Sequence, residues 1–401
     1  MREPIKVLFE HPSRSLYNPV LAVFAQIVRH IDRERFEVHI AVDREADGAL
    51  RLGDGGAVIS RWSIGAGPGK EHRGPWWAAS APSFAMSVAG LARYARANGI
   101  DVIHVDGTPS CGGIGLAVAR LARVPLVVHL HELLGRYPGG LHDHSPARRA
   151  VERQVARHAD RLVAVSRFIA DDVRASGSAR APIDVVPNGV DVERFHPDVD
   201  GTQIRREYGI EEDEPLALQL GRVLASKRQV DFVRALALAR RRVPNLRGLV
   251  IGWDDPGRPP GHAELRRMCA DEGIGDALVI AEGRSGAPQL MAAADILVTP
   301  GLDEAAGLVA LEAMASGRPV IGVRSGATPE IVLDGETGFI VPPKAPAELA
   351  ARLELLATDA ALRRRMGAAG RRRAETEFNA GLPAARFAPI YEELARPRSR
   401  G

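Results

Sequence analysis

Short apolar runs rich in β-branched residues alternate with longer amphipathic stretches along this chain, and the pattern occurs twice. Runs that are apolar on both faces and separated by helices are typical of a parallel sheet covered by helices on both sides. The first half therefore predicts one doubly wound α/β domain. Its expected strands are 5–9, 36–41, 102–105, 126–130, 162–165 and 184–186, and its expected helices include 19–30, 85–98, 114–121 and 167–176.

The second half repeats the alternation after a polar, proline- and glycine-containing break at 195–201. A chain of 401 residues is also longer than one hydrophobic core usually supports. We therefore expect two Rossmann-like domains facing a central cleft, residues 1–198 and 199–381, with a C-terminal helix (382–401) that crosses back to the first domain. The expected strands are 216–220, 249–251, 278–281, 296–299 and 320–323, followed by helices 346–358, 361–377 and 382–395.

The composition, 45% hydrophobic and 26% charged, is that of a folded globular chain. Arginine supplies nearly all of the 53 basic residues, which stand against 50 acidic ones. Such an arginine excess would suit a nucleic acid or a membrane surface, but the arginines are scattered among nearly as many acids. We attribute the excess to a GC-rich coding sequence. We expect no nucleic-acid partner, leave a peripheral membrane contact open, and infer no particular oligomeric state.

The two cysteines, Cys111 and Cys269, lie far apart and outside any metal-binding spacing. Neither a disulfide framework nor a zinc site is expected, and no metal or resident cofactor is predicted. The start of the chain lacks the pattern of a secretory signal, and no apolar stretch approaches the ~18 residues of a spanning helix. These features predict a cytoplasmic protein.

One glycine- and proline-rich segment, 65–83, fits the α/β pattern poorly and contains adjacent Trp76 and Trp77. Its GAGPGK string resembles a phosphate loop, but Ile64 and Glu71 stand where glycine and serine or threonine are required. We interpret the segment as an exposed loop with no strand leading into it. The two tryptophans are candidates for an acceptor contact, a lid or a membrane-touching tip, and a partly buried structural loop is the alternative.

Two cations follow the first strand of the second half. That strand ends at Gly221 and Arg222, and Lys227 comes five residues later, near the start of the next helix. Ligands of open α/β sheets bind at the carboxyl ends of the strands. Arginine suits bidentate phosphate contact and lysine supplies a point charge, so the pair is a candidate diphosphate site. Two solvated surface cations are the alternative.

Two glutamates flank the start of a later helix. The backbone amides of Gly307, Leu308 and Val309 open this helix and can face an anion. Glu304 lies in the loop before the helix and Glu312 about one turn inside it. One carboxylate can face the reacting end of a ligand and the other its hydroxyls. The alternative is that both acids complement the helix dipole.

Together these segments resemble the retaining nucleotide-sugar glycosyltransferases of family 4, which have the two-domain GT-B fold. The GR-x4-K pair of that family matches Gly221, Arg222 and Lys227, and its E-x7-E motif matches Glu304 and Glu312. The resemblance implies that the cations hold the donor diphosphate, that Glu304 contacts the transferred sugar and that Glu312 contacts the ribose. Further segments resemble the family in the expected order: 159–173, 184–197, 325–343 and the helical tail.

The resemblance extends to His131 in the first half, which directly follows the expected strand 126–130. This histidine matches the family position beside the donor sugar, while His129 and Glu132 replace the usual threonine and aspartate. Catalytic roles are thereby implied for His131 and Glu304. The resemblance also implies a UDP- or GDP-linked donor and a metal-independent front-face reaction, in which the departing phosphate oxygen takes the acceptor's proton.

The sequence departs from the family in two places. The loop EHPSRSLYNP lacks the usual Gly-Gly turn, so Arg14, Tyr17 and Asn18 are candidates to bind an acceptor through side chains. The usual EGFG is EAAG here. A non-catalytic nucleotide-sugar or glycan-binding protein and a nucleotide-sugar epimerase therefore remain alternatives. A nicotinamide oxidoreductase is disfavoured because no GxGxxG follows a strand. The acceptor is expected to be a small natural product, a lipid-linked sugar or a saccharide.

Overall fold

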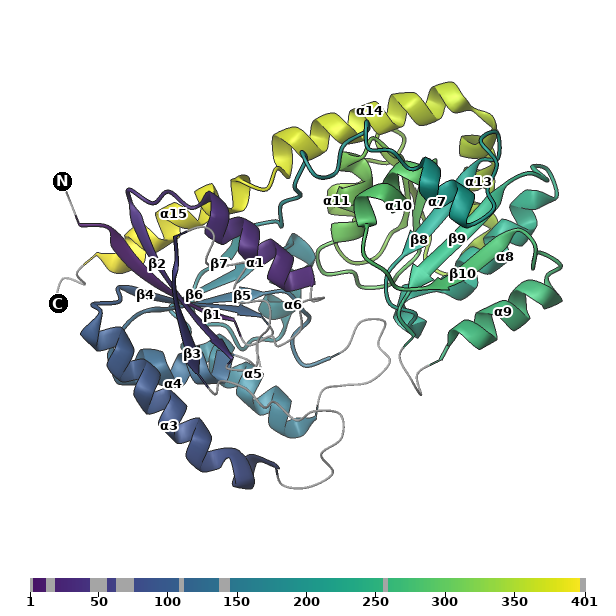
Figure 1. The fold of residues 1–401 in the computed structure, drawn as a ribbon. Helices are drawn as coiled ribbons and strands as arrows, with labels where there is room; N and C mark the ends of the chain where they lie inside the picture. Colours follow the sequence, from purple (N-terminus) through teal and green to yellow (C-terminus); the bar gives the residue numbers. More distant parts are fainter. Residues whose placement is uncertain are drawn as a thin grey trace. The chain divides into compact units, whose positions relative to one another are not determined.

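The computed structural model describes residues 3–11, 19–43, 56–62, 76–107, 112–136, 145–254 and 259–396, with the backbone alone at 11, 19–20, 43, 61 and 76–84. The chain divides into two compact units (Figure 1). Unit 1 holds the described residues up to Gly189 and from Ala380 onward, and unit 2 holds Val190–Asn379. The boundary expected after residue 198 lies inside unit 2, because Val190, Val192 and Phe195 are buried in that unit's core.

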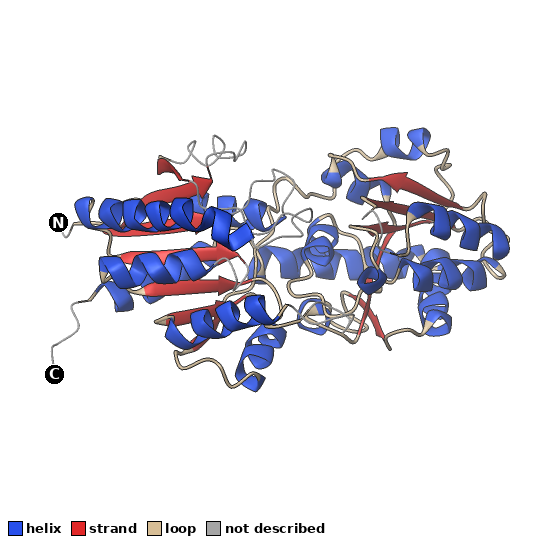
Figure 2. Ribbon diagram, turned by 90° about the horizontal axis from the view of Figure 1, so that it is seen from below, coloured by secondary structure: helices blue, strands red, loops and turns tan. Residues whose placement is uncertain are grey.

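Unit 1 contains a seven-stranded parallel sheet in the order β3-β2-β1-β4-β5-β6-β7. The strands are β1 (Ile5–His11), β2 (Phe36–Asp43), β3 (Val58–Trp62), β4 (Val102–Gly107), β5 (Leu126–Leu130), β6 (Arg161–Ala164) and β7 (Ile183–Val185). The helices are α1 (Pro19–His30), α3 (Trp76–Ala97), α4 (Gly112–Ala122), α5 (Pro146–His158) and α6 (Arg167–Ala175). Strands in each unit run side by side with helices beside them (Figure 2).

One region of unit 1 differs from the sequence-based expectation. The segment interpreted as a loop up to residue 83 is already helical from Trp76, and β3 ends shortly before it. Alanines 78, 79 and 81 favour a helix, and the helix continues past Pro82. The strand was missed because β3 is a short edge strand, Val58–Trp62, whose sequence is interrupted by an arginine.

Unit 2 contains a six-stranded parallel sheet in the order β10-β9-β8-β11-β12-β13. The strands are β8 (Leu216–Leu220), β9 (Arg247–Gly252), β10 (Leu278–Glu282), β11 (Ile296–Thr299), β12 (Val320–Val323) and β13 (Gly338–Val341). The helices are α7 (Thr202–Glu207), α8 (Gln229–Arg240), α9 (His262–Asp271), α10 (Ala287–Ala293), α11 (Leu308–Ala315), α12 (Thr328–Ile331), α13 (Pro346–Thr358) and α14 (Ala360–Glu377).

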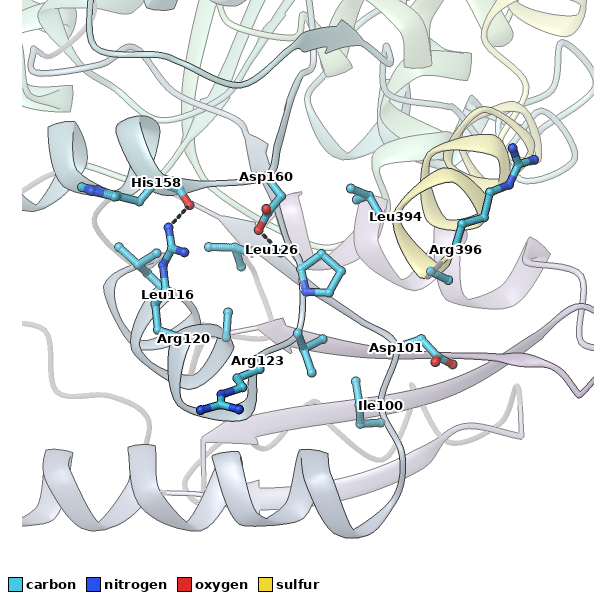
Figure 3. Close-up of a pocket in the computed structure, with 14 residues that line it drawn as sticks. Ile100, Asp101, Leu116, Arg120, Arg123, Leu126, His158, Asp160, Leu394 and Arg396 are labelled. Carbon is cyan, nitrogen blue, oxygen red and sulfur yellow. Dashed lines mark hydrogen bonds between the residues drawn. The ribbon is translucent and has the colours of Figure 1, made fainter. Parts of the chain in front are cut away.

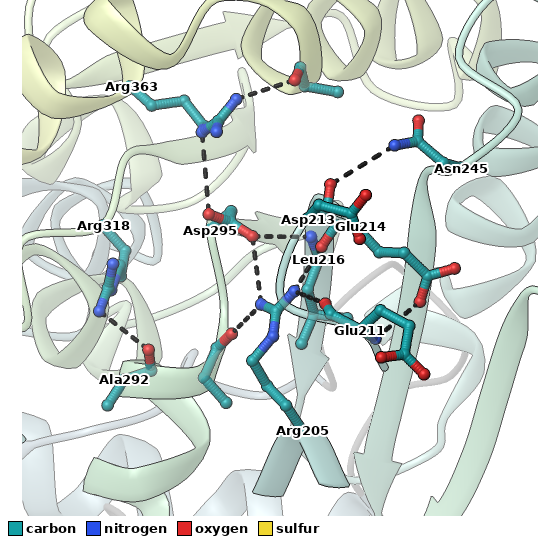
Figure 4. Close-up of polar contacts among 12 residues, drawn as sticks. Arg205, Glu211, Asp213, Glu214, Leu216, Asn245, Ala292, Asp295, Arg318 and Arg363 are labelled. Atoms are coloured by element: carbon teal, nitrogen blue, oxygen red, sulfur yellow. Dashed lines mark hydrogen bonds and ion pairs between the residues drawn. The ribbon is translucent and has the colours of Figure 1, made fainter. Parts of the chain in front are cut away.

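The amino edge of this second sheet is closed by an arginine–aspartate network (Figure 4). Arg205 of α7 donates to the carbonyl of Ala293 at 2.8 Å and lies 3.4 Å from the Asp295 carboxylate. The same carboxylate accepts the backbone N–H of Leu216 at 2.9 Å. These bonds join α7 to the starts of β8 and β11. The loops at the opposite, carboxyl edge carry the candidate ligand-binding residues.

The last helix, α15 (Leu382–Ala395), belongs to unit 1, where it contacts α1, β1 and β4. Phe387 and Tyr391 are fully buried, with stacked rings 5.7 Å apart, and the Tyr391 hydroxyl lies 2.6 Å from His104 Nδ1. Burial of two large aromatic side chains fixes the helix on the sheet. The expected return of the C-terminal helix to the first domain is confirmed.

Among the described residues, no helix combines the length and apolar character needed to cross a bilayer.

Candidate functional site

The loop after β8 is held by two buried glutamines. Gln219 Nε2 donates to the carbonyl of Lys227 at 2.8 Å, and Gln229 Nε2 donates to the carbonyl of Arg222 at 2.9 Å. Both glutamines are at most 5% exposed. The backbone at both ends of the loop is therefore held by buried side chains. The sequence interpretation missed both residues, although a glutamine inside the apolar strand LALQL is a detectable signal.

The cations themselves occupy different positions on this loop. Arg222 is exposed and has no ion-pair partner within the ranges that the structure describes. Lys227 ends a short 3-10 turn (Ala225–Lys227) directly before α8. The next residue, Arg228, adopts a left-handed conformation (φ 55°) and binds both oxygens of Asp231 at 2.7 and 2.8 Å. Arg222 and Lys227 are thus presented by a loop of fixed shape.

The loop that carries Glu304 is fixed in the same way by the segment after β12. The Asp303 N–H donates to Ser325 Oγ at 2.9 Å, and the Ala327 N–H donates to the carbonyl of Glu304 at 2.7 Å. Gly326, at φ 62°, packs directly on the Glu304 backbone, where any side chain would collide. The backbone of Glu304 is therefore held on two sides.

Lys227 and Glu304 meet in the structure. Lys227 Nζ lies 2.5 Å from Glu304 Oε1, and their side chains are 31% and 18% exposed. The two loops are also joined through the Leu302 N–H, which donates to the carbonyl of Ser226 at 2.7 Å. The sequence interpretation gave these two residues neighbouring roles but did not predict their contact. The Glu304 carboxylate therefore fixes the position of the lysine before a ligand phosphate binds.

The helix α11 begins beside these loops. Gly307 is its N-terminal capping residue at φ 53°, and the amides of Leu308 and Val309 lie in its first turn, where no intrahelical carbonyl is available to them. Glu312 is one turn further along. Burial raises the pKa of the Glu312 carboxyl to about 7, against the opposing effect of the nearby Arg194 charge. A carboxyl group that titrates near neutrality can accept or donate a hydrogen bond to ligand hydroxyls.

His131 lies in unit 1, directly after β5, in a cluster of buried polar groups. His131 Nε2 is 2.9 Å from Asp106 Oδ1, and His129 Nδ1 is 3.1 Å from the same oxygen. A carboxylate bonded to one ring nitrogen fixes the orientation of the imidazole. Burial, together with a smaller effect of the neighbouring His131, lowers the pKa of His129 to about 4, while Asp106 opposes the shift.

Like His104, Asp106 was missed by the sequence interpretation. It is fully buried near the end of β4, at a strand end where ligand-site residues are commonly found. Three atoms that could ligate a metal ion, one each from His104, Asp106 and His129, lie within 4.8 Å of one another. All three groups already have partners: His104 Nδ1 lies against the Tyr391 hydroxyl, and Asp106 Oδ1 contacts both His129 Nδ1 and His131 Nε2. That the protein needs no metal stays a prediction.

The candidate acceptor residues are not all placed. Arg14, Tyr17 and Asn18 lie outside the described residues. Trp76 and Trp77 open α3, and the positions of their side chains are likewise outside the description. Their roles at an acceptor stay predictions.

Comparison with known proteins defines the class. The model "Glycosyl transferases group 1" matches residues 200–373, and "Glycosyl transferase 4-like domain" matches residues 20–189. The Anabaena protein HepE, solved in complex with UDP and glucose, aligns with a TM-score of 0.80 over 97% of this chain and 100% of its own, at 22% identity. Two parallel-sheet Rossmann-like units of this kind define a GT-B protein, as expected from the sequence.

Closer relatives are known from sequence. A D-inositol 3-phosphate glycosyltransferase of Streptomyces bingchenggensis is 31% identical over 78% of this chain and 71% of its own length. A GDP-mannose-dependent α-(1-6)-phosphatidylinositol monomannoside mannosyltransferase of Mycolicibacterium smegmatis is 36% identical over 49% of this chain, and the match spans 52% of its length. The chain belongs to the GT4-type glycosyltransferases.

Proposed function

We propose that this protein is a retaining glycosyltransferase that moves a sugar from a nucleoside-diphosphate sugar to an acceptor hydroxyl. The observation that carries the proposal is the contact between Lys227 and Glu304 at the carboxyl edge of unit 2. One residue has the charge for a diphosphate and the other the acceptor atoms for sugar hydroxyls. Arg222 and the first amides of α11 complete the set of groups suited to an anionic donor.

The proposed chemistry follows from where charge develops. As the bond from the anomeric carbon to the leaving diphosphate breaks, negative charge grows on the phosphates and the sugar becomes oxocarbenium-like. Fixed donors already aimed at the phosphates lower this barrier without reorganising. Arg222, Lys227 and the amides of Leu308 and Val309 would act in this way. The departing phosphate oxygen would then take the proton of the attacking acceptor hydroxyl on the same face of the sugar.

The remaining groups would orient the donor. Glu304 would contact the hydroxyls of the transferred sugar, and Glu312 would hydrogen-bond the ribose. His131, whose ring is oriented by Asp106, would contact the transferred sugar, as the family resemblance implies. None of these roles requires a metal. The cytoplasmic location expected from the sequence stays a prediction.

The relatives support a narrower substrate class. Two of them are named for acceptors that carry inositol, one as a phosphate and one within a phospholipid. HepE is solved with UDP, and the mannosyltransferase is named for GDP-mannose. We therefore propose a UDP- or GDP-sugar donor and an inositol-bearing acceptor as the first combination to test.

The test is a turnover assay over a panel of UDP- and GDP-sugars, with and without inositol and inositol phosphates. The proposal expects nucleoside diphosphate release that depends on the acceptor. Arg222→Ala should lower donor affinity tenfold or more, at about 1.4 kcal/mol per factor of ten. Arg364→Ala, an exposed arginine on α14, is the matched control. Donor binding with no turnover would favour the binding-protein alternative, and donor conversion without acceptor would favour an epimerase.

A further inference from the structure

Helices α3, α4 and α5 lie next to one another on one face of the unit 1 sheet (Figure 1). They are 22, 11 and 13 residues long and contain one acidic residue, whereas the whole chain contains 50 in 401. That residue, Glu152, is fully buried, and its Oε1 accepts the Arg148 Nε–H at 2.7 Å. These helices therefore present no carboxylate of their own to solvent.

Arginines line the outward side of the same helices. Arg96 donates to the carbonyl of Leu121, and Arg120 donates to the carbonyl of His158 at 3.0 Å. Because a carbonyl carries no net charge, these bonds do not neutralise the two guanidinium groups. These two bonds also bring together the C-terminal ends of the three helices. Six exposed arginines have no carboxylate partner within the described part of the chain: Arg93, Arg96, Arg120, Arg123, Arg153 and Arg157.

Apolar side chains are exposed between these arginines. Met86 on α3 is 69% exposed, Leu121 on α4 is 49% exposed and Val151 on α5 is 39% exposed. Among the side chains that the structure describes, each helix thus contributes one large exposed apolar side chain to a surface rich in arginine. Cations with interspersed apolar side chains match the interface of an anionic bilayer, where the cations meet phosphates and the apolar groups enter the acyl boundary.

A cavity of 530 Å³ opens at the C-terminal ends of α4, α5 and α15 (Figure 3). Its apolar wall includes Leu116 and Leu126, and its cationic groups include Arg120 and Arg123. The cavity is also lined by two carboxylates, and both are already engaged: Asp101 accepts the Lys6 N–H at 2.8 Å and Asp160 accepts the Leu126 N–H at 3.0 Å. The cavity adds a recess with an apolar wall and cationic groups to the edge of the basic surface.

We propose that the outward side of α3, α4 and α5 binds the surface of an anionic lipid bilayer. The exposed Met86, Leu121 and Val151 favour a bilayer over a nucleic acid, because a phosphate backbone offers apolar side chains no partner. This surface belongs to unit 1 and uses none of the donor-site residues of unit 2. Failure of the proposed reaction would therefore leave this proposal intact, and the reverse also holds.

The test is co-sedimentation of the full chain with vesicles of phosphatidylcholine alone or mixed with phosphatidylglycerol. Binding is expected only to the anionic vesicles and should weaken with salt. A variant with Arg120→Gln, Arg123→Gln and Arg157→Gln should lose about a hundredfold in affinity, at about fivefold per arginine near the surface. The charge-matched control replaces Arg364, Arg365 and Arg372, all exposed on α14, by Gln and should bind as the wild type does.

Three outcomes would overturn the proposal. Equal binding to neutral and anionic vesicles would remove the role of charge. Equal losses in the α14 control would show an effect of net charge rather than of this surface. Binding of duplex DNA that needs the three arginines, without vesicle binding, would assign the surface to nucleic acid.

A Met86→Ser and Leu121→Ser variant should bind anionic vesicles more weakly, and unchanged binding would exclude the apolar contribution.

A different observation, in unit 2, carries a second inference. Trp253 directly follows β9 at the carboxyl edge and is 44% exposed. Its indole lies against Gly283, where a side chain would collide with the ring. Its carbonyl accepts the Val223 N–H at 2.9 Å, next to Arg222. A flat aromatic face is therefore held between the loops after β9 and β10, beside a candidate diphosphate residue.

We infer that the Trp253 indole stacks on the nucleobase of the donor, an inference that rests on the proposed function. Base–aromatic stacking is sequence-tolerant, and its loss would weaken binding about 5- to 150-fold. The test is calorimetry with UDP, GDP and inorganic pyrophosphate. Trp253→Ala should weaken both nucleotides and leave pyrophosphate binding unchanged, and Trp253→Phe should restore most of the loss.

The two hypotheses fail in different ways. If wild-type protein binds neither the nucleotides nor pyrophosphate, the donor site itself is wrong. If the wild type binds nucleotides and Trp253→Ala binds them equally well, only the stacking role is wrong. An equal loss for pyrophosphate in the alanine variant would show a general disturbance of the loop and would also overturn the inference.

Discussion

Replacing Lys227 by methionine distinguishes two roles of this lysine: stabilising the fold through its ion pair with Glu304, or binding the donor. The substitution keeps most of the side-chain length and removes the charge that contacts Glu304 at 2.5 Å. Both partners are partly exposed, so solvent screens the pair, and its loss should cost only about 0.2–1 kcal/mol of stability. The melting temperature should therefore change by no more than a few degrees.

The same substitution should act much more strongly on the donor. A charge-assisted hydrogen bond to a phosphate contributes about 1.5–3 kcal/mol, which corresponds to roughly 10- to 150-fold in affinity. Calorimetry with UDP and GDP, combined with thermal unfolding, measures both effects on one sample. The matched control is Arg228→Met on the neighbouring residue, whose charge is taken up by Asp231. That variant should lose stability and keep its donor affinity.

The reasoning would be refuted by the reverse pattern. If Lys227→Met lowered the melting temperature strongly but bound nucleotides as the wild type does, the contact with Glu304 would be a structural ion pair. If Arg228→Met weakened donor binding equally, the effect would come from the shape of the loop and not from the lysine charge.

Three further predictions concern stability and pH. Gly326→Ala, at φ 62° against the Glu304 backbone, should lower kcat and the melting temperature together, and an unchanged kcat would remove the link to Glu304. Burial raises the pKa of Glu10 to about 8, so the fold favours its protonated form, and stability should fall by about 1 kcal/mol from pH 7 to 9; Glu10→Gln should abolish this slope in thermal melts. The pKa of His129 is lowered to about 4, so stability should fall by up to about 3 kcal/mol as pH drops from 6.5 to 4. A free energy of unfolding that stays constant over this pH range in chemical denaturation would contradict this.

Much of the fold could be predicted because the strands of a doubly wound sheet are buried on both faces. The apolar runs at 126–130, 216–220 and 296–299 have the same bounds as β5, β8 and β11. The edge strand β3 lacked this signal, because one of its sides has no neighbouring strand and its sequence includes Arg61. The start of α3 was missed because Pro82 and the preceding glycines outweighed the alanines in the interpretation.

The candidate site was predictable in its residue types but not in its contacts. Strand ends and helix starts indicated Arg222, Lys227 and Glu304 as separate groups near one edge. Their spacing in sequence does not determine that Lys227 meets Glu304, since the two residues lie on different loops whose relation is set by Ser226 and Leu302. The contact of His131 with Asp106 likewise depends on the pairing of β4 with β5, which no single segment encodes.

The most direct test of the central claim is the anomeric configuration of the product, followed by proton NMR during turnover. With an α-linked nucleoside-diphosphate sugar and an inositol-bearing acceptor, the account predicts an α-linked product together with free nucleoside diphosphate. The rate should collapse when Arg222→Ala and Lys227→Met are combined. A β-linked product, or an α-linked product formed at an undiminished rate by the double variant, would contradict the account.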